Sequence, residues 1–311
     1  MSPTPHADHF RRRFAHDAGA GAIRAATAAL LTLLGCGDPV RDAPPPATGL
    51  ARATLHAPGA RWDSLTDGRL TVYAQPDTWA ALHHDEMRLR SARALDHALS
   101  LLGESSYPGH VRVFLLESPA HMALVTGQRH NGTADAASHA VLVVANRDWS
   151  PFDRHEIMHA ASLNLWGEPG AARRGSTAWR REGWLREGIA ALAEDRCGRW
   201  TGRGVAAAMH AAGEGTSLDE LTGSFYALDD LRAYLQAGSL VEYLLEIGGR
   251  DALRQLWRSG TAGLERVYGR DPAAIDVAWR AWLATTPAAE RPPDLEAMRE
   301  AGCGAGEPPR R

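Results

Sequence analysis

The sequence of 311 residues predicts an α+β fold, with a small mixed sheet and its helices in the N-terminal half and a mainly α-helical C-terminal half. Three short apolar runs typical of strands precede residue 147, whereas only patterns with helical period follow residue 150. The change falls just before His155-Glu156-Ile157-Met158-His159, so this motif lies at the junction of the two halves. A content of 44% apolar and 23% charged residues is that of a globular protein.

In the N-terminal half we expect strands at residues 70–74, 111–116 and 140–146, each short, apolar and rich in β-branched side chains. Residues 78–102 carry apolar side chains at helical spacing, and a short helix is expected at 120–125. Strands that alternate with helices predict a sheet covered by helices.

After residue 150 the apolar spacing predicts five helices, at residues 152–166, 179–196, 228–247, 250–259 and 272–285. Asp271 and Pro272 supply an N-cap and a first-turn proline for the last of them. We expect only helices in this half and no internal repeat.

The first 36 residues have the pattern of a targeting segment. Arg11, Arg12 and Arg13 form a basic region, and the apolar stretch 25–34 that follows is too short to span a bilayer as a mature helix. The segment ends Leu33-Leu34-Gly35-Cys36, which resembles the lipobox of bacterial lipoproteins. An ordinary signal peptide is the alternative. The three arginines also loosely resemble a twin-arginine signal, so the export route stays open.

The lipobox resemblance implies that Cys36 is diacylated and anchors the exported protein to the membrane of the cell envelope. We therefore expect four segments along the chain: a signal peptide at 1–36, a linker at 37–50, one domain at 51–286 and a Pro- and Gly-rich tail at 287–311.

Two further cysteines, Cys197 and Cys303, would face an oxidising compartment after export. Two cysteines allow only one pairing, and a pair of unrelated free thiols is the alternative. No CxxC spacing is present, so neither is a good candidate for a zinc ligand.

The charge pattern argues against a nucleic-acid partner. The formal net charge is −3, and all 34 basic residues are arginines interspersed with acidic residues. No basic stripe of the kind that binds phosphates stands out.

The motif at residues 155–159 matches HExxH, a pattern that suits a metal ion. Residues four apart on a helix lie about 40° from one another around the axis, so His155 and His159 can both reach one Zn²⁺. Glu156 is offset to the side, where its carboxylate can take a proton from a metal-bound water. A surface helix with two histidines four residues apart is the alternative.

Downstream, Trp184-Leu185-Arg186-Glu187-Gly188-Ile189-Ala190 resembles the WLxEGxA segment of the gluzincin-type peptidase MA-like family. The metzincin pattern does not fit, because it requires a glycine and a histidine where this chain has Ser162 and Leu165. The resemblance implies a zincin-like fold, one Zn²⁺ per chain, a peptide or protein substrate, and Glu187 as the third ligand on a second helix. The alternatives are Glu182, which has a similar local pattern, and a solvent-facing Glu187.

Further site candidates follow from the needs of such a centre. Glu194 and Asp195 could orient a metal-bound imidazole, with solvation of a helix end as the alternative. Tyr234 begins a segment that also resembles the family and is a candidate to stabilise the oxyanion, with a packing role as the alternative. His139 and His210 are spare candidates.

In that family an exposed edge strand precedes the HExxH helix, and we expect residues 141–146 to be this edge, to which a peptide could add as a further strand. The sequence thus predicts a zinc metallopeptidase. A binding or assembly module of the cell envelope that keeps the scaffold without turnover is the alternative function.

Overall fold

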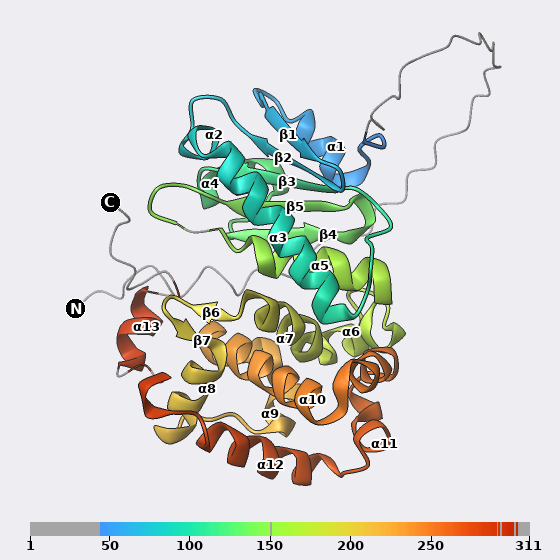
Figure 1. Cartoon of the computed structure of the whole chain (residues 1–311), viewed down its shortest axis with the longest axis vertical. Coiled ribbons are helices and arrows are strands. Elements are labelled where there is room, and N and C mark those ends of the chain that lie inside the picture. Colours follow the sequence, from blue (N-terminus) through green and yellow to red (C-terminus); the bar gives the residue numbers. More distant parts are fainter. Residues whose placement is uncertain (1–43, 150, 291, 293, 302, 304–311) are drawn as a thin grey trace, which may run out of the picture.

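The computed structural model describes residues 44–149, 151–290, 292, 294–301 and 303. The predicted signal peptide and the lipid anchor predicted at Cys36 lie outside these residues. The described chain is α+β, with one small mixed sheet followed by a mostly helical remainder (Figure 1). Within the part of the chain that the structure describes, no helix combines the length and apolar composition needed to cross a bilayer.

The sheet has five strands in the order β1-β2-β3-β5-β4. β2, β3 and β5 run parallel in the middle, and an antiparallel strand closes each edge. The strands span β1 Asp63–Asp67, β2 Leu70–Ala74, β3 Val111–Leu116, β4 Gly132–Asp135 and β5 Ala140–Val144.

Helices cover both faces of the sheet (Figure 1). Alternate residues of a strand point to opposite faces, so Val113 and Val141 pack beneath α3 (His84–Leu102) and α5 (Asp153–Trp166). Phe114 on the other face packs with residues of α1 (Gly49–Leu55) and α4 (Pro119–Thr126). Because both faces are covered, β3 and β5 are buried along their whole length, which explains why both are apolar except at Arg112, whose guanidinium donates to the backbone carbonyls of His110 and Pro45.

The prediction of which strand forms the edge of the sheet is wrong. β5 lies between β3 and β4, so the strand expected at 140–146 is internal and shorter, and β4 forms the edge. β4 and β1 had no signal in the sequence, since Gly132–Asp135 and Asp63–Asp67 lack an apolar run.

In the helical half, α5, α7 (Gly183–Glu194) and α10 (Asp230–Ser259) pack against one another at the centre. Gly188 lets α7 approach α10 closely, since a Cβ there would lie 2.8 Å from the carbonyl oxygen of Ala237. The other helices are α2 Trp79–Leu82, α6 Thr177–Arg181, α8 Gly202–Ala211, α9 Leu218–Ser224, α11 Leu264–Tyr268, α12 Pro272–Ala284 and α13 Leu295–Ala301.

Two features of this half differ from the prediction, and one agrees with it. The helix expected at 179–196 divides at Glu182 into α6 and α7. The break expected between the helices at 228–247 and 250–259 is confirmed, because Gly249 within α10 has a non-helical backbone with a φ of 71° that divides α10 into two helical segments. A short hairpin, β6 (Arg196–Cys197) and β7 (Trp200–Thr201), also interrupts the half that was expected to hold only helices.

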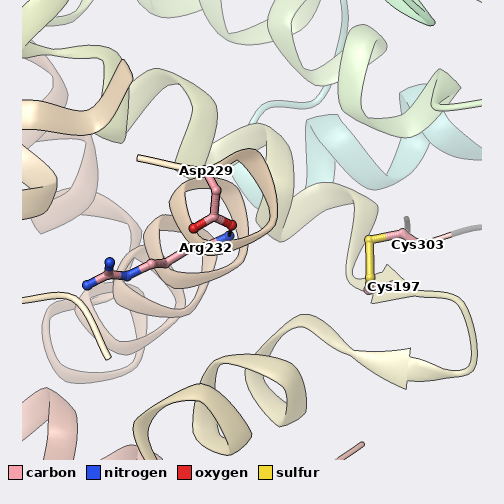
Figure 2. The surroundings of a disulfide bond; sticks show 4 residues. All are labelled: Cys197, Asp229, Arg232 and Cys303. Atoms are coloured by element: carbon pink, nitrogen blue, oxygen red, sulfur yellow. Dashed lines mark hydrogen bonds between the residues drawn. A yellow bond between two sulfur atoms is a disulfide. The ribbon is translucent and has the colours of Figure 1, made fainter. Parts of the chain in front are cut away.

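Cys197 and Cys303 form a disulfide, which resolves the two alternatives left by the sequence (Figure 2). The bond joins the hairpin after α7 to the residues after α13. Met298 of α13 is buried in a small cluster with Val205 of α8 and Leu235 of α10. The described part of the segment expected as a tail is therefore packed on the helical half.

Candidate metal centre

Three predicted ligands come together between α5 and α7. His159 Nε2 lies 3.1 Å from His155 Nε2 and 3.1 Å from Glu187 Oε2, and His155 Nε2 lies 3.4 Å from the same carboxylate oxygen. A tetrahedral zinc ion with bonds of about 2.1 Å separates its ligand atoms by about 3.4 Å. The three donor atoms therefore form one face of a tetrahedron of the right size and chemistry for Zn²⁺.

The third candidate ligand, Glu187, is held by its helix. Glu187 lies one turn after Trp184, and both are buried, Trp184 completely and Glu187 with 8% of its surface exposed. A carboxylate in such surroundings is costly unless charged or hydrogen-bonding partners face it. The two imidazoles are those partners here.

The electrostatics favour the metal-binding form of Glu187. Burial by itself raises the pKa of this carboxyl, but the charge of His159, hydrogen bonds with both histidines and the Arg186 guanidinium together hold the pKa well below its usual range. The carboxylate is therefore ionised at neutral pH, as a metal ligand must be.

Glu156 lies on α5 beside the two histidines and packs against β4. Its side chain touches the backbone of Gly132, where a Cβ would lie 2.5 Å from Oε1. Gly132 pairs with Val143 of β5, so the sheet edge fixes the wall against which this carboxylate rests. The sequence analysis missed Gly132, because β4 itself had no recognisable pattern.

The four residues open into a cleft of about 1350 Å³. β4 lines one side of it, and Asp230 and Tyr234 of α10 line another. The Tyr234 ring lies 5.7 Å from the His155 ring and is packed against Phe225. Tyr234 therefore borders the cleft from α10, next to His155.

Among the described contacts, neither carboxylate predicted to orient the histidines bonds to an imidazole ring. Glu194 accepts a hydrogen bond from the backbone N–H of His155 at 3.3 Å, so it caps the first turn of α5. Burial, with a contribution from Asp153 that outweighs the opposing charge of Arg90, raises its pKa to about 8. Asp195 is exposed and lines a small separate pocket.

The alternative third ligand, Glu182, has a structural role. Its Oε2 accepts hydrogen bonds from the backbone N–H and the hydroxyl of Thr261, at 2.8 and 2.9 Å, which ties the start of α7 to the turn that follows α10. The spare histidines are also engaged elsewhere: His139 bonds the Tyr107 hydroxyl, and His210 packs on the Trp279 ring.

Arg186 is the second residue of the site that the sequence analysis did not single out. Only 3% of it is exposed, and its guanidinium stacks on Trp179 at 3.8 Å from the ring centroid. One signal was available, since Arg186 is the only basic residue in the apolar run from Trp184 to Ala193.

Comparison with known proteins gives a weak structural likeness. No family model and no curated protein matches the chain. Among solved structures it is similar to a mutant M1 zinc metallopeptidase from Deinococcus radiodurans bound to the substrate Tyr-Ser-Ala, with 18% identity and a TM-score of 0.34. The match covers 75% of this chain and 54% of the other, so this chain spans about half of that structure's length. A likeness of this strength assigns no function.

Proposed function

We propose that this protein is a zinc-dependent metallopeptidase. The observation that carries the proposal is the triangle of His155, His159 and Glu187 donor atoms, with Glu156 beside it in an open cleft. Two imidazoles and one carboxylate are the ligands that hydrolytic zinc sites use, with the fourth position left for water or substrate.

When bound, Zn²⁺ supplies a Lewis acid and lowers the pKa of a coordinated water. Glu156 is the general base: it takes a proton from that water and later gives it to the leaving amine. Tyr234 donates a hydrogen bond to the oxyanion that develops on the scissile carbonyl. The wall of β4 at Gly132 keeps the Glu156 carboxylate beside the ligands.

The substrate is a peptide in extended conformation. β4 lines the cleft, and in the described sheet it pairs on one side only, with β5. Its other side offers backbone N–H and C=O groups, to which a peptide can add as a strand. The peptide would thus pair with β4 and not with residues 141–146, which the sequence had suggested as the exposed edge.

We also propose that the protein is exported and tethered through Cys36. The lipobox-like sequence is the basis for this part of the proposal. The disulfide between Cys197 and Cys303 supports it, since such bonds form and persist in oxidising compartments.

A cleavage assay on a peptide library, with and without a chelator, tests the proposal together with metal analysis. We expect one zinc per chain and hydrolysis that the chelator abolishes. Glu156→Gln should keep the zinc and lose about 10²–10⁴-fold in kcat, His159→Ala should lose the zinc, and the exposed control Glu265→Gln should behave as the parent. Zinc binding without any cleavage would instead favour the non-catalytic binding module.

A further inference from the structure

Arg186 presents a buried charge next to the proposed metal ligand. It lies inside α7 with 3% of its surface exposed. Removing a guanidinium from water costs several kcal/mol unless its hydrogen bonds and charge are matched. The contacts of this side chain therefore indicate what it does.

Three contacts hold the guanidinium in place. It stacks on the Trp179 ring of α6, Nη2 donates a hydrogen bond to the Tyr226 hydroxyl at 2.6 Å, and Nη1 donates to the Trp179 carbonyl at 3.5 Å. Trp179 is itself anchored, since its Nε1 donates to Glu168 at 3.1 Å. The planar group thus has one position, set by residues outside α7.

From that position the guanidinium faces two carboxylates. Nε lies 3.9 Å from Glu187 Oε1, and Nη1 lies 3.9 Å from Glu168 Oε2. The other oxygen of Glu187, Oε2, is the one that faces His155 and His159. The two oxygens of Glu187 are therefore divided between the arginine and the imidazoles.

We propose that Arg186 is a positioning residue for the metal centre, an inference that rests on the proposed function. Its guanidinium attracts Oε1 of Glu187 and so turns Oε2 toward the histidines, which sets the rotamer of the ligand before a metal ion arrives. The Glu168 carboxylate faces the guanidinium at Nη1, away from Nε, the atom that faces Glu187. A lysine cannot fully replace Arg186, because stacking on Trp179 and bonding to Tyr226 need the planar fork of arginine.

Zinc affinity, measured by competition with a chromophoric chelator, tests this inference independently of turnover. Loss of a group that orients a metal ligand costs about 10–100-fold in metal affinity, so Arg186→Met should raise the zinc Kd by that factor. Arg186→Lys should fall between this variant and the parent. Arg181→Met, an exposed arginine of α6, is the matched control and should leave the Kd unchanged.

Thermal unfolding of the metal-free variants separates positioning from folding. A purely structural role would lower the Tm of metal-free Arg186→Met and leave its zinc Kd within about twofold of the parent, which would overturn the inference. If Arg186→Met does not fold, Tyr226→Phe decides, because Tyr226 is at the surface and its hydroxyl holds the guanidinium. A Kd raised at least about threefold supports the inference, and an unchanged Kd refutes it.

If the parent chain and Arg186→Met bind zinc equally well, only the positioning role is refuted. A parent chain with no measurable zinc binding would contradict the proposed function itself, and the inference with it.

Discussion

Gly132→Ala is the sharpest test of how the sheet serves the proposed general base. A Cβ at this position would lie 2.5 Å from Oε1, 2.9 Å from Cγ and 3.0 Å from Cδ of Glu156. Three atoms of one side chain would be too close, so the carboxylate must move away from β4. Restoring ordinary contacts of about 3.5 Å requires a displacement on the order of 1 Å.

The size of the effect follows from that displacement. A catalytic group misplaced by about 1 Å can cost about 100-fold in rate, equivalent to roughly 2.7 kcal/mol of transition-state stabilisation. Glu156 is not one of the three proposed ligands, so zinc binding should be unchanged. We expect Gly132→Ala to contain one zinc and to lose about 100-fold in kcat/KM.

The assay is peptide hydrolysis by the purified variant, alongside metal analysis and thermal unfolding. Gly223→Ala is the matched control, because a Cβ at that glycine meets no atom within 4 Å and its φ lies outside the left-handed region. A folded Gly132→Ala protein that cleaves at the parent rate would refute the reasoning. Such a result would mean that the position of Glu156 does not depend on the absence of a side chain at residue 132.

Three further predictions concern the disulfide, Tyr234 and Glu182. Replacing Cys197 and Cys303 by serine should lower the free energy of unfolding by up to about 5 kcal/mol in urea titrations, because the bond closes a loop with a sequence separation of 106; an unchanged midpoint would contradict this. Tyr234→Phe should lower kcat by about 10²–10³-fold with little change in KM, and parent-like kcat would exclude the phenol from catalysis. Glu182→Ala should cost about 1.5–3 kcal/mol of stability through its bonds to Thr261 and keep the zinc; loss of the metal would show that Glu182 is a ligand after all.

The sequence predicted the parts of the fold that depend on local pattern. The three central strands begin where their apolar runs placed them, because β2, β3 and β5 are covered on both faces and consist mainly of apolar side chains. The edge strands β1 and β4 were not predicted. Edge strands need fewer apolar residues, so strand pairing sets their positions more than composition does.

The candidate ligands were predictable for a similar reason. The helical repeat alone brings His155 and His159 onto one face of α5. Glu187 came from a local resemblance in α7, and the structure brings it to the histidines across a helix–helix contact. The roles of Glu194 and Glu182 were not predictable, since each depends on a single hydrogen-bond partner far away in the chain, the backbone of His155 for one and Thr261 for the other.

Both residues that the sequence analysis missed act on carboxylates. Gly132 borders Glu156, and Arg186 faces Oε1 of Glu187. The i,i+4 spacing places two imidazoles well, because an imidazole has few rotatable bonds and a helix restricts them further. A glutamate has three rotatable side-chain bonds, so its backbone position leaves the carboxylate free over several ångströms. The orientation of the proposed base and of the proposed third ligand therefore depends on contacts with β4, α6 and Tyr226. A motif of five or seven residues does not contain these contacts.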